Sequence, residues 1–507
     1  MEDIHRAVGP DGENRLAHAF AAPGGGRQNG QQRLFFWNKR QPVLKDEMAM
    51  AALDTLETLW RLARLPAEGL APAQLPGQDP VFPSSFPVGL AAQVTTAAAA
   101  LAACELAHLR GTPRQQVTVQ ARQAAIECTG WFLLDGKEPE YWDPITGLYE
   151  TADGHVRIHA NFAHHRDGAL RLLGLDVAHA SRDTVQQALR GWRAIDFETA
   201  AAAQGLVVTA LRSFAQWDGS PQGRAVAAQP VMTFTRLDDA PPLALPALDA
   251  AARPLSGVRV LDLTRILAGP MGGRALASHG ADVMLVNSPA LPNIGAIVDT
   301  SRGKRSALVD LDTAAGRDAL WSLVDGAHVF SQGYRPGSLA AKGFSPRALA
   351  ERRPGLVMVS LSAYGTKGPW AGRRGFDSLL QTAMGFNHAE GEAAGDGKPR
   401  AMPMQILDQA TGFLMAFGAA AALWRQQSEG GSWLVEVSLA QTAQWLRGLG
   451  RVDDGLACPR PDVNACLQDY PCGYGALRAL PPAAELARTP AGYVRASVPP
   501  GTDAPSW

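Results

Sequence analysis

Residues 401–424 read AMPMQILDQATGFLMAFGAAAALW, and this stretch decides how the chain is organised. After Asp408 no charged residue occurs before Arg425, so the pattern predicts a long helix that is buried on nearly all sides. Asp408 stands in the first turn of that helix, where backbone N–H groups and the helix dipole favour an anion. The residues alone leave two interpretations open: Asp408 caps the helix, or Asp408 is a buried reactive carboxylate.

The overall composition is that of a globular protein. The chain of 507 residues is 46% hydrophobic and 19% charged, which allows two or three domains with full cores. A formal net charge of -1, without a sustained run of Lys and Arg, argues against nucleic-acid binding. We therefore expect small molecules and other protein chains as partners.

The sequence also argues against a membrane protein. No charge-free apolar run approaches the roughly 20 residues needed to cross a bilayer, and the N-terminus lacks the order of a signal peptide. We expect a cytoplasmic protein with no membrane partner. The odd number of cysteines fits reduced thiols in that compartment, because their spacing matches neither a CxxC pair nor a zinc pattern. They are Cys104, Cys128, Cys458, Cys466 and Cys472.

The histidines cluster in one region without predicting a metal site. No Cys or carboxylate stands at ligand spacing from them, so structural or surface histidines are the expectation and no metal is predicted. They are His155, His159, His164 and His165.

The stretch around Asp408 has a counterpart earlier in the chain. Residues 88–109 form a second helix of small residues, and each helix is followed by an expected strand, at 117–119 and 435–437, and then by a short helix rich in Gln and Ala. The alignment places Pro87 on Pro403, Gln93 on Gln409 and Thr95 on Thr411. We interpret this as an internal repeat in which Ala92 takes the place of Asp408.

Shifts in composition divide the chain into segments. Residues 1–47, rich in Gly, Gln, Asn and Arg, predict a disordered tail, and residues 48–140 carry a truncated first copy of the large-domain helices. Residues 141–236 predict a smaller α+β domain with a hairpin turning at Asp153-Gly154. A Pro- and Ala-rich linker at 237–256 precedes the main domain at 257–450 and a C-terminal tail segment at 451–507.

Short apolar strands alternate with helices through the main domain. Strands are expected at 258–262, 283–286, 308–310, 328–331 and 357–361, and helices at 271–278 and 314–324. This order predicts an α/β fold with a doubly wound, mostly parallel sheet, which binds ligands beyond the carboxyl ends of its strands. The first turn, LTRILAGPMGG, has neither the G-x-G-x-x-G spacing nor the GK[ST] ending, so neither NAD nor ATP is expected.

Five segments of this domain resemble the class III CoA-transferase family, the carnitine and formyl-CoA transferase (CaiB/BaiF) type. They are VRVLDLTRILAGPMGGRALASHGADVMLVN, SRGKRSALVDLDTAAGR, YRPGSLAAKGF, VSLSAYGTKGPWAGRRGFDSLLQ and the QILDQATG around Asp408. The resemblance covers 255–449. Residues 90–236 and 457–507 resemble further parts of a family member, so the chain resembles a truncated copy fused to a second copy.

The resemblance implies a Rossmann-like domain, CoA or acyl-CoA as substrate, a carboxylic acid as second substrate, and no permanently bound cofactor. It implies that Asp408 is the nucleophile, which forms an acyl anhydride and then an aspartyl-CoA thioester. It also implies an interlocked homodimer or, given the repeat, a pseudo-dimer within one chain. The CoA contacts that it implies are Arg265, Ile266, Leu267, Ala268, Lys304, Arg305, Tyr334, Arg335, Tyr364 and Gly365.

Departures from the family pattern keep two alternatives open. Leu285, Asn287 and Ser288 stand where the family usually has a Lys-x-Glu pattern and a basic residue, and Gly333 where it commonly has Asn. These changes allow a catalytically silent acyl-CoA-binding or assembly protein. Racemase relatives have a His at the position of Phe376, so an acyl-CoA racemase is a less favoured alternative.

Overall fold

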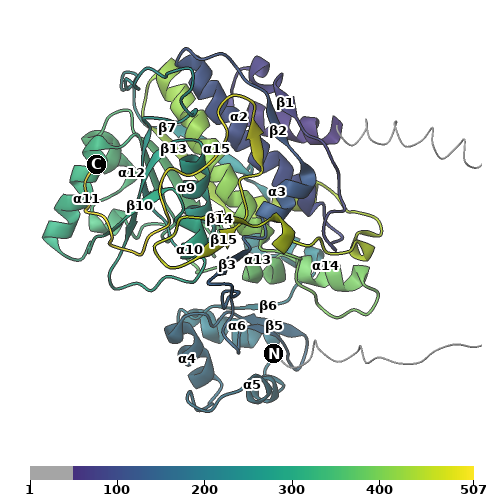
Figure 1. Cartoon of the computed structure of the whole chain (residues 1–507). Helices are drawn as coiled ribbons and strands as arrows, with labels where there is room; N and C mark the ends of the chain where they lie inside the picture. Colours follow the sequence, from purple (N-terminus) through teal and green to yellow (C-terminus); the bar gives the residue numbers. More distant parts are fainter. Residues whose placement is uncertain (1–49) are drawn as a thin grey trace, which may run out of the picture. The chain divides into compact units, whose positions relative to one another are not determined.

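The structure, a computed structural model, describes residues 50–507; the predicted tail at 1–47 lies outside them. Its main sheet has the strand order β10-β9-β8-β11-β12-β13-β7, and every pair is parallel except β13 with β7. The predicted α/β fold with a doubly wound, mostly parallel sheet is confirmed (Figure 1). The strands are β7 Met232–Arg236, β8 Arg259–Leu263, β9 Asp282–Asn287, β10 Lys304–Leu308, β11 Val329–Gln332, β12 Val357–Ser362 and β13 Trp433–Ser438.

The helices of the main domain are α9 Ala268–Ser278, α10 Ile297–Thr300, α11 Ala314–Gly326, α12 Pro346–Arg352, α13 Asp377–Ala383, α14 Phe386–Ala393, α15 Ile406–Glu429 and α16 Leu439–Gly448. Short 3-10 turns lie at Ala340–Lys342, Gly455–Ala457 and Asn464–Cys466. The helix predicted around Asp408 is therefore confirmed as α15.

Helices cover both faces of this sheet, and the strand register explains how. Val260 pairs with Val283, and both belong to the hydrophobic core that includes α9 and α15. The next residues along these strands, Leu261 and Met284, pair with each other and belong to a second core with α11 and α12. Successive strand side chains point to opposite faces, so this alternation builds three layers. It also explains why these strands are apolar throughout.

The direction of winding reverses once. The chain passes from β8 to β9 and β10 on one side, and then returns to β11, β12 and β13 on the other. The carboxyl ends of β8 and β11 therefore flank a switch point, where doubly wound sheets bind their ligands.

One strand of this sheet was misplaced by the sequence pattern. The expected strand at 308–310 overlaps β10 at Leu308 only, because β10 begins at Lys304. Lys304 and Arg305 do not resemble strand interior residues. Lys304 Nζ is neutralised by Asp262 Oδ2 at 2.8 Å and is fully buried, which allows a basic segment to form an edge strand.

Helices α2 (Val88–Leu109) and α15 lie side by side in the core (Figure 1). Strand β2 (Val117–Val119) and helix α3 (Ala121–Glu127) follow α2, as β13 and α16 follow α15. β2 has a parallel neighbour, β1 (Ala73–Gln74), and an antiparallel one, β16 (Ala484–Leu486). β13 likewise has parallel β12 and antiparallel β7. The correspondence fits the repeat, which stays a prediction.

Residues 141–236 contain an antiparallel sheet in the order β4-β5-β6 and a hydrophobic core of their own. β4 pairs with β5 across the predicted turn at Asp153-Gly154, so the hairpin is confirmed. The elements are β4 Gly147–Glu150, β5 His155–Ile158, α4 Ala163–Leu172, α5 Arg182–Leu189, α6 Ala194–Ala203, β6 Val208–Ala210, α7 Phe214–Asp218 and α8 Pro221–Ala227. We keep the predicted domain boundaries as a proposal.

The tail segment joins the first half of the chain. Besides β16, it supplies β14 (Gln468–Tyr470) and β15 (Leu477–Ala479), and β15 pairs with β3 (Phe132–Leu134). A 3-10 turn at Ala67–Leu70 completes the first half. Residues from both ends of the described chain are thus tied to one another by main-chain hydrogen bonds.

Within residues 50–507, two helices are long and apolar enough to cross a membrane, although each contains charged residues. They are α2 and α15, and 94% and 100% of their apolar windows are buried within the protein. Their apolar character is explained by the core they form together.

Candidate active site

Asp408 lies in the first turn of α15 and is 9% exposed. Its backbone N–H donates to Oδ2 of Asp377 at 2.9 Å. Asp377 is the first residue of α13 and is fully buried, and its Oδ1 accepts a hydrogen bond from Gln381 Nε2 at 2.6 Å. The N-terminus of α15 is therefore capped by a side chain from another helix. This leaves the Asp408 carboxylate available for a ligand and argues against a capping role for it.

The two carboxyl groups influence each other's ionisation. Burial raises the pKa of Asp377 to about 6, although hydrogen bonds from the Asp408 N–H and from Gln381 act in the other direction. Burial raises the pKa of Asp408 well above its ordinary value, and the neighbouring Asp377 charge raises it further. The pair therefore resists carrying two negative charges near neutral pH unless a ligand compensates them.

Asp408 lines a cavity of about 480 Å³, which we call the Asp408 cavity. A cavity of this size is in the range that holds a small molecule. The turn after β8 contributes Ile266 and Leu267, and α15 contributes Gln409. The aromatic lining consists of Phe82, Trp131, Tyr141, Trp142, His159 and Phe376. Residues 460–464, from the C-terminal tail segment, line one side of the cavity.

A second cavity, of about 310 Å³, shares Ile266 and Phe376 with the first and so adjoins it. Most of its lining comes from the loops after β8, β11 and β12, at the switch point of the sheet, and the rest comes from residues 162–165 and 291–292. We call it the arginine cavity, because four guanidinium groups line it and, within residues 50–507, no carboxylate does. The four are Arg265, Arg335, Arg373 and Arg374. Such a group of fixed charges suits a ligand with several phosphates.

The arginines of this cavity are only partly neutralised. Arg373 lies 3.8 Å from Glu198 Oε1, but Glu198 is also bound to Arg212. Burial lowers the pKa of Arg374, and the nearby Arg335 charge lowers it further. An anion between Arg335 and Arg374 would relieve their repulsion.

Ile266, at the junction of the two cavities, has a left-handed backbone with φ of 77°. This conformation is unfavourable for a β-branched residue, and such strain concentrates at functional sites. Asp262 at the end of β8 stabilises this turn. Its Oδ1 accepts one hydrogen bond from the backbone N–H of Thr264 at 3.1 Å and a second from the Thr264 hydroxyl at 2.5 Å. Lys304 in turn holds Asp262 through the other oxygen.

The structure brings some predicted CoA contacts together and not others. Arg265, Ile266, Leu267, Tyr334 and Arg335 line one or both cavities. Ala268, the first residue of α9, is buried and lines neither.

The structure contradicts the expectation that Lys304 and Arg305 contact CoA. Lys304 is 1% exposed and its ammonium is bound by Asp262 and by the carbonyl oxygen of Pro270 at 2.7 Å, so it cannot reach a phosphate in solvent. Arg305 is bound to Asp282 at 3.0 and 3.1 Å and lines neither cavity. Their basic character neutralises carboxylates of the sheet.

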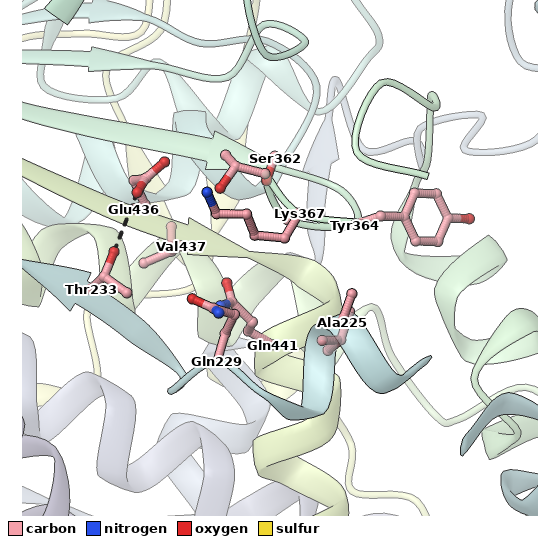
Figure 2. Close-up of a pocket in the computed structure, with 12 residues that line it drawn as sticks. Ala225, Gln229, Thr233, Ser362, Tyr364, Lys367, Glu436, Val437 and Gln441 are labelled. Atoms are coloured by element: carbon pink, nitrogen blue, oxygen red, sulfur yellow. Dashed lines mark hydrogen bonds between the residues drawn. The ribbon is translucent and has the colours of Figure 1, made fainter. Parts of the chain in front are cut away.

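Tyr364 and Gly365 line a third, smaller cavity of about 20 Å³. Figure 2 shows this cavity, with Thr233 hydrogen-bonded to Glu436 and Lys367 extending toward Ser362 and Glu436. A space of this size holds about one water molecule. These two residues line neither larger cavity, although the small cavity shares Ser362 with the arginine cavity and so adjoins it.

Sequence reasoning missed three residues that the geometry brings to the site. Asp377 belongs to GFDSLL, but its link to Asp408 depends on a contact between helices 31 positions apart. Arg373 and Arg374 form an Arg-Arg pair in the loop after β12, and a basic pair following a parallel strand was a usable signal.

The histidines are also closer to the site than predicted. His159 lines the Asp408 cavity, and His164 and His165 line the arginine cavity. Burial and the nearby Arg157 charge lower the pKa of His159 to about 3, so its ring is neutral. Within residues 50–507 no group of three or more His, Cys, Asp or Glu side chains could hold a metal ion.

Comparison with known proteins shows which family the sequence matches. The sequence profile of CoA-transferase family III matches residues 255–452. An acyl-CoA transferase from Gibberella moniliformis (strain M3125 / FGSC 7600) is 30% identical over 407 residues, which is 72% of this chain and 71% of that relative. The chain belongs to CoA-transferase family III.

Other similar proteins match shorter parts of the chain. A probable fatty acyl-CoA transferase from Mycobacterium tuberculosis is 33% identical over 42% of this chain, and the chain spans 59% of its length. The crystal structure of a hypothetical protein from Mycobacterium tuberculosis, 32% identical, matches 39% of this chain and 58% of that one with a TM-score of 0.35.

Proposed function

We propose that this chain transfers CoA from an acyl-CoA to a carboxylic acid, with Asp408 as the nucleophile. The observation that carries the proposal is the position of Asp408, on a cavity that adjoins a second cavity lined by four arginines. CoA carries its phosphates at one end and its thiol at the other. Phosphates in the arginine cavity would let the pantetheine arm pass Ile266 and Phe376 and deliver the thioester to Asp408.

The proposed reaction proceeds through two kinds of aspartyl intermediate. A carboxylate oxygen of Asp408 attacks the thioester carbonyl; the C–S bond breaks, CoA leaves as thiolate, and an acyl-aspartyl anhydride forms. The thiolate then attacks the aspartyl carbonyl, which releases the first acid as carboxylate and leaves an aspartyl-CoA thioester. The acceptor carboxylate repeats the sequence in reverse and regenerates Asp408.

The cap on α15 supports this role. Asp377 holds the backbone of Asp408 through a hydrogen bond of 2.9 Å, so the nucleophile is fixed at the helix end. Only the ionised Asp408 attacks, and its raised pKa means that this form has to be produced at the site. The positive charge of the arginine cavity and the helix N-terminus would favour that form.

A direct test is to incubate the protein with a panel of acyl-CoA donors and acids, and to read CoA exchange by mass spectrometry. We expect exchange that needs both a donor and an acid and that is lost in Asp408→Asn. The alternative is a catalytically silent acyl-CoA-binding or assembly protein. It predicts acyl-CoA binding, measured by calorimetry, without exchange for any pair.

Racemisation is a further alternative, because His159 lies in the Asp408 cavity although Phe376 occupies the position of the racemase histidine. A histidine with a pKa of about 3 is a poor base for a proton next to a carbonyl. We therefore expect no deuterium uptake at the α-carbon of a 2-methylacyl-CoA in heavy water. Uptake that His159→Phe abolishes would favour the racemase.

We also propose that the two halves of one chain pack as a pseudo-dimer. The supporting observations are the contact of α2 with α15 and the equivalent strand pairings around β2 and β13. An interlocked homodimer remains the alternative, and light scattering of the purified chain separates one chain per particle from two.

A further inference from the structure

The Asp408 cavity has an aromatic wall built from three parts of the chain. Trp131 and Tyr141 stack with ring centroids 6.3 Å apart. Trp142 meets the edge of the His159 ring at 6.0 Å, and His159 stacks on Phe376 at 4.0 Å with the ring planes 11° apart. The rings form two groups beside the proposed nucleophile, one of Trp131 with Tyr141 and one of Trp142, His159 and Phe376.

Trp131 and Tyr141 each have their polar atom in a hydrogen bond outside this wall, whereas Nδ1 of His159 is buried and has no hydrogen-bond partner among the described residues. Trp131 Nε1 donates to Asn464 Oδ1 at 2.8 Å, and the Tyr141 hydroxyl donates to the Gly130 carbonyl oxygen at 3.3 Å. His159 is neutral, so it presents an uncharged ring. The wall therefore offers its apolar faces to whatever fills the cavity.

The charges around the cavity disfavour a second carboxylate in the substrate. Three acidic side chains line it: Asp299, Asp408 and Asp462. Asp299 is paired with Arg302 at 2.6 Å and with Arg274. Among the described residues, Arg460 is the one Lys or Arg side chain in the lining, and Asp462 lies two positions from it. Asp299 is neutralised by its two arginines and Arg460 is offset by Asp462, so a terminal carboxylate on the acyl group would find no surplus positive charge in the lining to bind it.

We infer that the acyl group transferred by this chain is bulky and uncharged, either aromatic or medium-length aliphatic, and that it packs against Trp131, Tyr141 and Trp142. This inference rests on the proposed transfer reaction. Short dicarboxylic acids are poor substrates. The volume of about 480 Å³ gives such a group room beyond the reacting carbonyl.

The test compares acceptor acids against one donor, butyryl-CoA. Straight-chain monocarboxylic acids from butyrate to octanoate should gain about three- to fourfold in kcat/KM for each methylene, because each buried methylene contributes about 0.8 kcal/mol. Octanoate and 3-phenylpropanoate should exceed succinate and glutarate. A kcat/KM for succinate or glutarate at or above that for octanoate would overturn the inference and leave the transfer reaction intact.

Replacing a tryptophan of the aromatic wall tests whether the wall itself binds the acyl group. Trp142 is 44% exposed, so Trp142→Ala should fold normally. It should lower kcat/KM for octanoate about tenfold and leave butyrate within about twofold, as expected when the lost contact is apolar area. Trp192→Ala removes a tryptophan of the same region that lines neither cavity, and should change neither value. Equal losses for butyrate and octanoate in Trp142→Ala would overturn the inference.

The inference also has a readout that does not need turnover. If no acid accepts CoA, the proposed function fails, but calorimetry of the wild type with octanoyl-CoA and succinyl-CoA still ranks the two acyl groups. We expect at least about tenfold tighter binding of octanoyl-CoA. Equal affinities, or a preference for succinyl-CoA that Arg460→Ala removes, would overturn the inference and assign Arg460 to a second carboxylate.

Discussion

The carboxylate of Asp377 accepts the backbone N–H of Asp408 at 2.9 Å, and it thereby links the cap of α15 to the ionisation of the proposed nucleophile. One side chain fixes where Asp408 lies and also opposes its negative charge. Arg157 acts on Asp377 from β5 in the opposite sense, since its charge favours ionised Asp377. Position and reactivity of Asp408 are therefore set by the same contact.

The first prediction is that Asp377→Asn moves the acid limb of the pH profile to lower pH. In the wild type, kcat/KM should rise with pH as Asp408 ionises, and burial with the Asp377 charge delays that ionisation. Asparagine removes the charge but keeps an oxygen that can accept the N–H. Profiles between about pH 5 and 9 check this. An unchanged acid limb would mean that Asp377 does not influence the reacting group.

The second prediction concerns Asp408→Asn, which should abolish transfer and yet stabilise the protein at alkaline pH. The folded-state pKa of Asp408 is raised, so the wild type loses stability as pH rises through the range in which Asp408 ionises in the folded protein. Because asparagine does not ionise, the free energy of unfolding of the variant should exceed that of the wild type at alkaline pH by an amount on the order of 1–3 kcal/mol. The loss begins near the unfolded-state pKa of about 4, so urea unfolding should show a small advantage at about pH 5 and a larger one at about pH 8.5.

A pH-independent difference in that experiment would contradict the ionisation argument. Asp462→Asn is the matched control, because Asp462 also lines the cavity but is exposed. It should retain transfer and show no gain in stability at either pH.

The third prediction is that CoA phosphates bind the arginine cavity and not β10. Arg335→Ala combined with Arg374→Ala should weaken CoA binding at least about tenfold and flatten its dependence on salt, because exposed phosphate contacts are screened by ions. Arg305→Ala removes an arginine that lines neither cavity and should leave the affinity unchanged. Calorimetry at low and high salt measures both. Loss of binding in Arg305→Ala alone would restore the original assignment.

The sequence was sufficient for the fold because the pattern that carries it is local. Small apolar residues over 88–109 and 406–424 predict the two core helices, and apolar strands between helices predict the parallel sheet. The sequence pattern misplaced the start of β10, because a buried Lys304 is tolerated in a strand only when Asp262, 42 positions earlier, neutralises its charge. No local sequence pattern predicts an ion pair between residues so far apart in the chain.

The site was predictable only where its residues share one motif. Asp408, Arg265, Arg335 and Asp377 all stand in segments that resemble the family, but the role of Asp377 depends on the packing of α13 against α15, which no local pattern shows. The aromatic wall is harder still to predict, since residues 131–142, His159 and Phe376 come from three separate parts of the chain. These relationships exist only after folding.

The fourth prediction is that Lys304 contributes to stability rather than to CoA affinity. Lys304→Met leaves Asp262 buried and without its partner, which costs about 3–5 kcal/mol for a buried pair. Urea unfolding should show this loss, and calorimetry below the unfolding transition should show CoA affinity within about threefold of the wild type. A stable variant with weakened CoA binding would return Lys304 to the phosphate site.

The last prediction is that each chain carries one reactive carboxylate. Ala92, which aligns with Asp408, is fully buried in α2, and a methyl group cannot attack a thioester. None of the four arginines of the arginine cavity comes from residues 50–140. Hydroxylamine added with an acyl-CoA donor should convert one aspartate per chain to a hydroxamate, on the peptide that contains Asp408, and none in Asp408→Asn. Two modified aspartates per chain, or a modified peptide from the first half, would show that the first half has a reaction centre of its own and that the two halves are not related as proposed.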